Sequence, residues 1–197
     1  MTGQVLWLYG ADAVGKSAVG WEAYAILAQV AAAGGAAGEP VAYVDTDYLG
    51  FCAPAPADQG ALVAHNLAAV WAGFAAAGVR RLVVSGIVVT VEDRGRFEQA
   101  IPGATFTFCR LTARADTVRA RILLRREVEE RSRGSELSAE ARAELGAYGD
   151  RSVAFAELLE RPGWEDFAVA TDDRAPAVIA EEVVDRWRAQ DRGAPVG

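Results

Sequence analysis

One segment near the N-terminus has the residue types and spacing needed to hold a chain of phosphates. Residues 10–17 read Gly-Ala-Asp-Ala-Val-Gly-Lys-Ser and match the pattern G-x-x-x-x-G-K-[ST]. In this pattern the glycines let backbone N–H groups wrap a phosphate, and the N-terminus of the following helix adds a favourable dipole. We call residues 10–17 the phosphate loop. The residues expected to contact the bound phosphates are Gly10, Ala11, Asp12, Ala13, Val14, Gly15, Lys16, Ser17 and Ala18.

Two side chains of the phosphate loop have chemistry of their own. Lys16 is expected to reach the β- and γ-phosphates as a mobile charge with a catalytic role, and the Ser17 hydroxyl to coordinate Mg²⁺. Of the 20 lysines and arginines in the chain, Lys16 is the single lysine. The alternative, a glycine-rich turn before an ordinary helix, is weak because the match directly follows a predicted strand and opens a predicted helix. The sequence therefore predicts binding of ATP, or a similar nucleoside triphosphate, with Mg²⁺.

A pair of acids follows the second apolar run of the chain. Asp45 and Asp47 close that run at the carboxyl edge of the expected sheet, where open α/β sheets bind ligands. On an extended segment, side chains two positions apart point the same way. One carboxylate can then hold Mg²⁺ or its waters while the other approaches a substrate hydroxyl. In the alternative interpretation, one or both acids only cap a turn before residues 48–50.

The elements that position these residues are indicated by short apolar runs that alternate with longer segments of helical spacing. Strands are expected at residues 5–9, 41–44, 81–84, 104–111 and 167–170. Helices are expected at residues 16–33, 59–77, 115–131, 138–159 (as one helix or two) and 175–188. This alternation predicts an α/β domain with a parallel sheet covered on both faces by helices.

Composition and charge exclude several other classes of protein. The 197 residues are 52% hydrophobic with a net charge of −7, which predicts a folded domain and argues against nucleic acid as a partner. The most apolar long stretch, residues 23–38, is too short to span a bilayer, and residues 1–4 lack the basic start of a signal peptide. Cys52 and Cys109 fit no zinc or disulfide spacing. We therefore expect a cytoplasmic protein that binds no membrane.

A phosphate loop followed by Asp-x-Asp at the end of the second strand resembles the small-molecule kinases of the P-loop class. Shikimate, gluconate and adenylylsulfate kinases and chloramphenicol phosphotransferase are examples. The resemblance implies a three-layer fold with a five-stranded parallel sheet in the order 2-3-1-4-5. It also implies that Asp45 supports the metal and that Asp47 is the base that contacts the acceptor hydroxyl.

A second part of the resemblance concerns a lid. Leu111-Thr112-Ala113, followed by Val118-x-x-Arg121-Ile122-x-x-Arg125, resembles the run that leads from the fourth strand into the kinase lid. It implies a helical lid around residues 115–137, within a single domain of residues 1–190, with residues 191–197 as a tail. In such a lid Arg121, Arg125 or Arg126 clamps phosphates or stacks on adenine. A plain solvated helix face is the alternative, because these arginines alternate with acids.

Two positions depart from the kinase pattern. Ser85 ends the third strand, where many other P-loop NTPases have an acid that supports the metal, so metal support falls chiefly on Asp45. Asp12 brings a negative charge into the phosphate loop unless its side chain points outward. This second departure leaves the acceptor unspecified.

Three functions remain open from the sequence. The first is an ATP-dependent phosphotransferase that acts on a hydroxyl of a small metabolite, and the second is a nucleotide-dependent switch with slow or no hydrolysis. The third is an NTPase that transfers the phosphoryl group to water. A closed pocket at Asp47 lined by polar side chains would favour the kinase, whereas a partly exposed apolar surface on the alanine-rich helices would favour the switch. Tyr48, Phe51 and Cys52 belong to a loop that is a candidate lining for an acceptor pocket.

Overall fold

A computed structural model describes residues 3–35 and 38–193 as alternating strands and helices. In chain order these are β1 (Gln4–Tyr9), α1 (Lys16–Ala33), β2 (Val41–Asp45), η2 (Thr46–Leu49), α2 (Gln59–Ala76), β3 (Arg81–Ser85), α3 (Val91–Ala100), β4 (Thr105–Thr112), α4 (Ala115–Ser132), α5 (Ala139–Glu160), β5 (Phe167–Ala170) and α6 (Pro176–Gly193). None of the described helices has both the length and the apolar character required to cross a bilayer.

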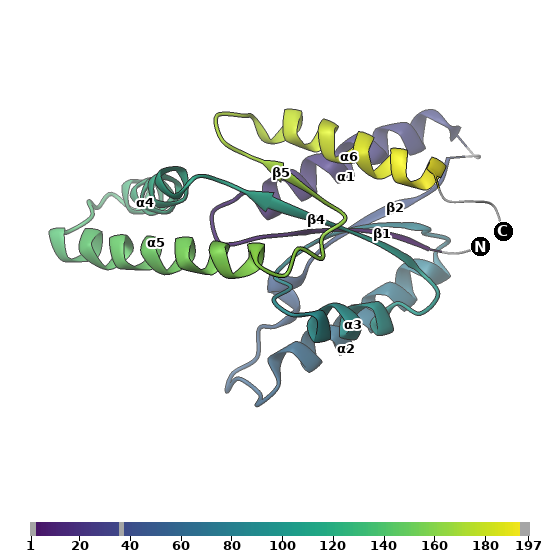
Figure 1. The fold of residues 1–197 in the computed structure, drawn as a ribbon, viewed down its shortest axis with the longest axis horizontal. Coiled ribbons are helices and arrows are strands. Elements are labelled where there is room, and N and C mark those ends of the chain that lie inside the picture. Colours follow the sequence, from purple (N-terminus) through teal and green to yellow (C-terminus); the bar gives the residue numbers. More distant parts are fainter. Residues whose placement is uncertain (1–2, 36–37, 194–197) are drawn as a thin grey trace.

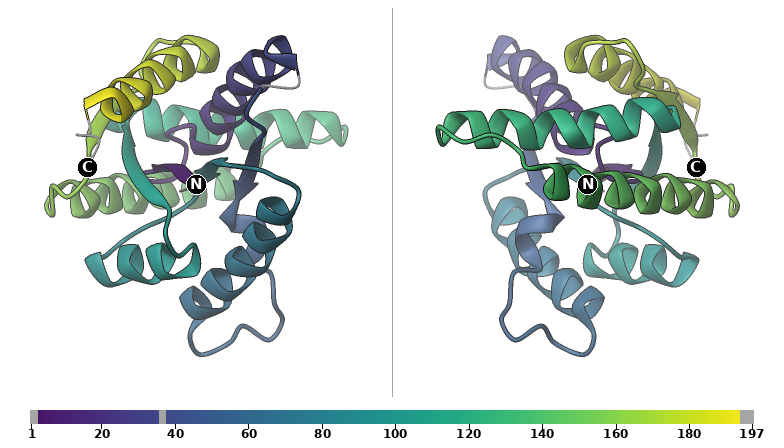
Figure 2. Two further views of the ribbon diagram at one scale, coloured as in Figure 1. Left: turned by 90° about the vertical axis from the view of Figure 1, so that its right-hand side faces the viewer. Right: turned by 90° about the vertical axis from the view of Figure 1, so that its left-hand side faces the viewer.

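The sheet confirms the expected topology. Its five strands are all parallel and lie in the order β2-β3-β1-β4-β5. Helices α1 and α6 pack together on one face, and α2 and α3 cover the other (Figures 1 and 2). Helices α4 and α5 pack against each other and project beyond the carboxyl ends of the strands (Figure 1). This is the three-layer α/β arrangement that the sequence predicts.

The central strand β1 shows why the sheet has a core on each side. Its side chains alternate between the two faces, as in any strand. Leu6 and Leu8 belong to the apolar cluster under α1 and α6, whereas Val5, Trp7 and Tyr9 belong to the cluster under α2 and α3. All five side chains are fully buried. The continuous apolar run at residues 5–9 is therefore the signature of a strand that is covered on both faces.

Helix α3 is a difference from the sequence-based expectation, which placed no helix between the third and fourth strands. The helix is mostly polar, and Phe97 is its single buried residue, so it has almost no apolar periodicity. Its N-terminus is fixed by a capping box, in which the Thr90 side chain accepts from the Asp93 N–H and the Asp93 carboxylate accepts from the Thr90 N–H. The Thr-x-x-Asp spacing was the available signal.

The C-terminal half differs from expectation at the ends of its elements. Residues 139–160 form one continuous helix, α5, where one or two helices were expected. The final helix, α6, continues to Gly193, so residues 191–193 of the expected tail are helical, and residues 194–197 lie outside the described part of the chain.

Phe108 on β4 tests the importance of the core under α2 and α3. The side chain is fully buried and packs beside Trp7, with ring centroids 6.0 Å apart. We expect Phe108→Ala to lower the free energy of unfolding by about 3–5 kcal/mol, because it removes buried apolar surface and leaves a cavity. Urea denaturation measures this loss. Leu124→Ala on α4, where Leu124 is 58% exposed, is the control and should change the stability by no more than about 0.5 kcal/mol. Equal losses in the two variants would contradict the assignment of the core.

Candidate functional site

The phosphate loop joins β1 to α1 in a conformation that its glycines make possible. Gly10 has φ 150° and Gly15 has φ 99°, both in the region that favours glycine. A Cβ atom on Gly10 would lie 2.5 Å from the carbonyl oxygen of Leu111, so the loop approaches β4 too closely for any side chain there. Ala13 also has a positive φ, 63°. The backbone is therefore held in a curled shape before any ligand binds.

Lys16 closes the phosphate loop from within. Its Nζ donates hydrogen bonds to the carbonyl oxygens of Gly10 (3.1 Å) and Ala11 (2.9 Å), and its side chain is only 7% exposed. Burial lowers the pKa of Lys16, and nearby carboxylates oppose this shift, chiefly Asp12 and then Asp47 and Asp45. The structure thus brings the predicted cation and the predicted acids into one electrostatic neighbourhood.

The acidic pair has a different backbone from the one expected. Residues Thr46–Leu49 form a 3-10 helix, η2, rather than an extended segment. The Oδ1 atom of Asp45 accepts a hydrogen bond from the Asp47 N–H (3.1 Å), so Asp45 does cap a turn. The Asp47 side chain is exposed, yet partial burial, followed by the charge of Asp45, raises its pKa, and the charge of Lys16 opposes this. A raised pKa makes Asp47 a stronger proton acceptor than an ordinary aspartate.

Tyr43 is a site residue that sequence reasoning missed. Its hydroxyl lies 2.8 Å from the Ser85 Oγ, 3.4 Å from the Asp45 Oδ2 and 3.4 Å from the Ser17 carbonyl oxygen. Burial is the main cause that raises the pKa of Tyr43 to about 12, so the hydroxyl keeps its proton at neutral pH. The available signal was its position on β2 two residues before Asp45, which places both side chains on one face. Tyr43 therefore links the start of α1 to the end of β2.

Ser17 and Asp45 fit a weakly coordinated Mg²⁺. The Tyr43 hydroxyl lies within hydrogen-bond distance of the Asp45 carboxylate and of the Ser17 backbone carbonyl, and Ser17 is exposed at the start of α1. Within residues 3–35 and 38–193, no group of three or more His, Cys, Asp or Glu side chains is arranged to hold a metal ion. Mg²⁺ in nucleotide sites commonly takes one or two protein ligands and completes its shell with phosphate oxygens and water. Ser17 and Asp45 would supply two such protein ligands.

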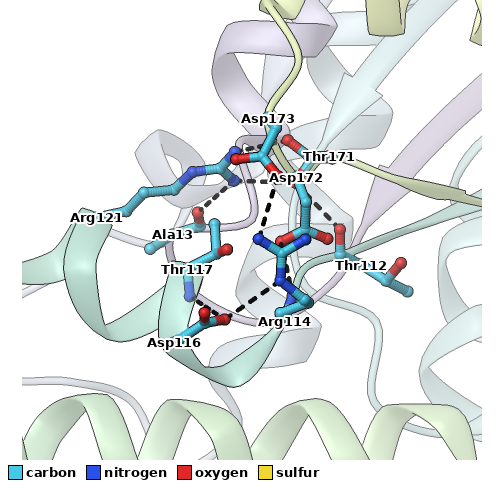
Figure 3. Close-up of polar contacts among 9 residues, drawn as sticks. All are labelled: Ala13, Thr112, Arg114, Asp116, Thr117, Arg121, Thr171, Asp172 and Asp173. Atoms are coloured by element: carbon cyan, nitrogen blue, oxygen red, sulfur yellow. Dashed lines mark hydrogen bonds and ion pairs between the residues drawn. The ribbon is translucent and has the colours of Figure 1, made fainter.

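Arg121 connects three segments at the base of the projecting helices. One of its nitrogens, Nη1, donates to the Ala13 carbonyl oxygen (3.3 Å) and to the Thr171 Oγ1 (2.9 Å), and Nη2 donates to the Thr171 carbonyl oxygen (2.6 Å) (Figure 3). The guanidinium therefore fastens α4 to the phosphate loop and to the end of β5. These contacts give Arg121 a positioning role, and its catalytic role stays a prediction.

The neighbouring arginines of α4 divide into two kinds. Arg126 pairs with Glu129 and Glu130 on its own helix, as expected for a solvated face. Arg125 has no hydrogen bond or ion pair within the described chain, and it lines a cavity of about 120 Å³ together with Asp12 and Tyr148. Of the candidate lid arginines, Arg125 is thus the one whose guanidinium remains available to a ligand beside the phosphate loop.

Asp12 points toward α5. Its Oδ2 accepts a hydrogen bond from the Tyr148 hydroxyl (2.6 Å), and its Oδ1 lies 3.9 Å from the Lys16 Nζ. The Ser152 hydroxyl donates to the Asp12 backbone carbonyl (3.3 Å). No local pattern pointed to Tyr148 or Ser152, which lie more than 130 positions from Asp12 along the chain. Asp12, the acid that departs from the kinase pattern, therefore attaches the phosphate loop to α5.

A hydrogen bond and an ion pair join the segment after β5 to the residue before α4. The Arg114 N–H donates to Asp172 (2.9 Å), and the Arg114 guanidinium pairs with Asp173 (3.1 Å) (Figure 3). Together with the Arg121 contacts to Thr171, these bonds fix the segment after β5 against α4.

A cavity of about 650 Å³ opens beside Asp47, on the side of the sheet covered by α2 and α3. Its wall includes Phe51 from the loop expected to line an acceptor pocket, whereas Tyr48 and Cys52 of the same loop are exposed and do not line it. The full lining is Thr46, Asp47, Gly50, Phe51, Gln59, Gly60, Val63, Ile87, Val89, Asp93 and Phe97.

The fold is similar to those of several solved structures, among them small-molecule kinases. A gluconokinase from Sinorhizobium meliloti 1021 superposes with a TM-score of 0.58 at 20% identity, covering 97% of this chain and 94% of that one. An APS kinase from Mycobacterium tuberculosis, solved with AMPPNP and APS, gives 0.55 at 22% identity, covering 93% and 96%. A tunicamycin resistance protein from Deinococcus radiodurans gives 0.54 at 15% identity, covering 93% and 95%. No protein-family model and no curated protein matches the chain. These likenesses confirm the fold.

Tyr43→Phe tests the link between Ser17 and Asp45. Because the variant loses the hydroxyl that holds these two residues together, we expect the affinity for MgATP to fall about three- to tenfold. The affinity for ATP without Mg²⁺ should change little. Isothermal titration calorimetry with and without Mg²⁺ measures both. Tyr24→Phe is the matched control, because Tyr24 packs beside Tyr43 and its hydroxyl has no partner in the described chain. An equal loss with and without Mg²⁺ would contradict the metal-side role.

Tyr148→Phe tests the attachment of α5 to Asp12. The hydrogen bond to Asp12, and then burial, raises the pKa of Tyr148 to about 12, whereas an unfolded tyrosine titrates near ~10. At a pH between the unfolded and folded pKa values, the unfolded chain has lost the Tyr148 hydroxyl proton and the folded chain has kept it. The free energy of unfolding of the wild-type protein therefore falls as pH rises through this range. The variant lacks this contribution, and its stability should fall less steeply over that range.

Urea denaturation of both proteins from neutral pH to pH ~12 measures the effect on the Tyr148 titration. Below the unfolded pKa the difference in stability should be constant, with the variant less stable because Asp12 has lost its donor. If the curves of unfolding free energy against pH for the two proteins stay parallel up to the highest pH, the hydrogen bond between Tyr148 and Asp12 does not form in solution.

Proposed function

We propose that this protein is a Mg²⁺-dependent phosphotransferase that moves the γ-phosphoryl group of ATP to a hydroxyl of a small molecule. The observation that supports this most directly is the position of Asp47. Its carboxylate is close enough to Lys16 to influence the pKa of that lysine, and it also lines the cavity of about 650 Å³. A carboxylate shared between a phosphate site and a pocket is suited to accept a proton from a bound alcohol.

In the proposed step, the acceptor hydroxyl oxygen forms a bond to the γ-phosphorus, and the bond from that phosphorus to the bridging oxygen breaks. The electron pair of the broken bond leaves with ADP, and the hydroxyl proton passes to the Asp47 carboxylate. Lys16 and the N–H groups of the phosphate loop bind the β- and γ-phosphates. Mg²⁺, held by Ser17 and Asp45, would neutralise charge on the phosphate oxygens.

The α4–α5 hairpin acts as the lid in this proposal. Arg121 and Asp12 attach it to the phosphate loop, and Arg125 supplies a cation at the mouth of the site. Phosphoryl transfer depends on positioning and charge, so a free arginine beside the phosphates contributes to the transition state without any covalent role. The loop shape, the buried Lys16 and the Ser17–Asp45 pair support ATP with Mg²⁺ as the donor.

Two variants separate nucleotide binding from transfer. Lys16→Ala should abolish the rise in melting temperature with MgATP, because the loop loses both its internal bonds and its phosphate cation. Asp47→Asn should keep that rise and lower transfer by about 10²–10⁴-fold, because the amide cannot accept the proton. Differential scanning fluorimetry and transfer of phosphate from ATP to a panel of hydroxylated metabolites and small antibiotics measure the two effects.

Asp185→Asn is the matched control for the loss of a carboxylate, because Asp185 is exposed on α6. Full transfer by Asp47→Asn, or tight MgATP binding by Lys16→Ala, would overturn the proposed roles. Stabilisation by MgATP without transfer or hydrolysis would instead support the nucleotide-dependent switch, and phosphate release without an acceptor would support a hydrolase.

A further inference from the structure

The charge of the cavity beside Asp47 restricts the acceptor, provided that the proposed transfer takes place there. Two acids, Asp47 and Asp93, are among the described residues that line the cavity, and none of those lining residues is a lysine or an arginine. Lys16 acts on Asp47 from the phosphate loop. The Arg96 guanidinium lies against Gly60 of the wall. It is already paired with Asp58 (3.2 Å) and with Asp93 (3.8 Å). An anionic acceptor would therefore meet carboxylates without a free cation to offset them.

This arrangement differs from what recognition of an acid requires. Carboxylates and phosphates are bound by arginine forks, by lysines or by helix N-termini that face the ligand. The one lysine of the chain is committed to the phosphate loop, and Arg96 is held outside the cavity by its two carboxylates. A carboxylate or phosphate group on the acceptor would thus be desolvated beside Asp47 without a lysine or arginine among the described residues of the wall to offset its charge, which costs affinity.

Most of the other side chains of the wall are apolar, although Thr46 and Gln59 are polar. Five of its side chains are Phe51, Val63, Ile87, Val89 and Phe97. Phe51 is 81% exposed and Val89 is 39% exposed, so apolar surface at the edge of the cavity is left open to solvent. Concave sites with a mostly apolar wall and a few polar groups are typical of small-molecule pockets, and uncovered apolar surface is a common mark of such sites. An acceptor with an apolar body would cover this surface.

We infer that the acceptor is a neutral or cationic alcohol with an apolar, ring-sized body, and that the site discriminates against acids. The hydroxyl faces Asp47, the apolar body lies against the wall formed by Val63, Ile87 and Phe97, and Phe51 covers it from the loop that follows η2. A cationic group on the acceptor is stabilised by Asp47 and Asp93. Sugar acids and phosphorylated acceptors are disfavoured by the same charges.

Four small alcohols test this inference. Phenylglycinol, styrene glycol and tropate share one skeleton with a phenyl ring and a primary alcohol, and they differ in the remaining substituent, which is a cation, a neutral hydroxyl or an anion. Glycerol has the neutral diol of styrene glycol without the ring. We expect kcat/KM for phosphate transfer to phenylglycinol and to styrene glycol to exceed that for tropate about tenfold or more, because of charge repulsion at short range. Glycerol should be at least about tenfold poorer than styrene glycol, because it buries no ring.

Binding of the same four compounds to the protein without nucleotide, followed by saturation-transfer NMR, provides a second readout. This arm separates the two hypotheses, because it does not depend on transfer. If transfer fails for every compound while phenylglycinol and styrene glycol bind and tropate does not, the phosphotransferase proposal fails and the inference on the cavity holds. The inference is overturned if tropate binds or reacts as well as styrene glycol does. It is also overturned if glycerol binds or reacts as well as styrene glycol does.

Val89→Arg supplies the missing cation at the edge of the cavity. The variant should raise kcat/KM for tropate relative to phenylglycinol about tenfold, and it should shift binding in the same direction. Val178→Arg on α6 is the matched control, because Val178 is also exposed and belongs to an element that does not line the cavity. It should leave the order of the four compounds unchanged. An unchanged order in a folded Val89→Arg protein would show that charge at this wall does not select the acceptor.

Discussion

The buried ammonium group of Lys16 is the interaction on which the rest of the site depends. It bonds to two carbonyl oxygens at the end of β1, and so it holds the phosphate loop closed around the start of α1. A cation in that position costs desolvation, which the carboxylates of Asp12, Asp47 and Asp45 offset. The three acids must therefore converge on Lys16 from the loop itself and from β2 and η2. This convergence places an acid beside the site proposed for the transferred phosphate.

The projecting helices are held to the same loop from the other side. Arg121 of α4 bonds to the carbonyl oxygen of Ala13, and Tyr148 of α5 bonds to the carboxylate of Asp12. Both contacts use groups of the loop that a bound phosphate chain does not need, namely a carbonyl and an acid. A change in the loop on nucleotide binding would thus reach α4 and α5 directly. This is the physical basis for treating the hairpin as a lid.

The proposed acceptor cavity is built by the polar helix α3 and the loop after η2. Asp93 and Phe97 of α3 contribute to it together with Asp47, although they lie more than 40 positions from Asp47 along the chain, and Phe51 adds a side chain from the loop. Arg96 pairs with both Asp58 and Asp93, so its charge is already engaged outside the cavity. In the proposed function, the charge of the wall is the feature that restricts the class of acceptor.

The sequence by itself determined the phosphate loop and the alternation of strands and helices in a parallel sheet, because both depend on local patterns: a spacing of glycine, lysine and serine, and apolar runs between helical segments. The order of the strands was expected only from the resemblance to P-loop kinases. The sequence did not determine the turn at Thr46–Leu49, the Tyr43 link, the partners of Arg121 or Asp12, or helix α3. Only the tertiary structure decided these. The hydrogen bonds of Tyr43 to Ser17 and Ser85, of Arg121 to Thr171 and of Tyr148 to Asp12 each span 26 positions or more. Helix α3 buries a single side chain. Neither the bonds nor the helix therefore leaves a periodic signal. Hydrogen bonds between distant segments are chosen by the packing of the whole chain and not by any local pattern.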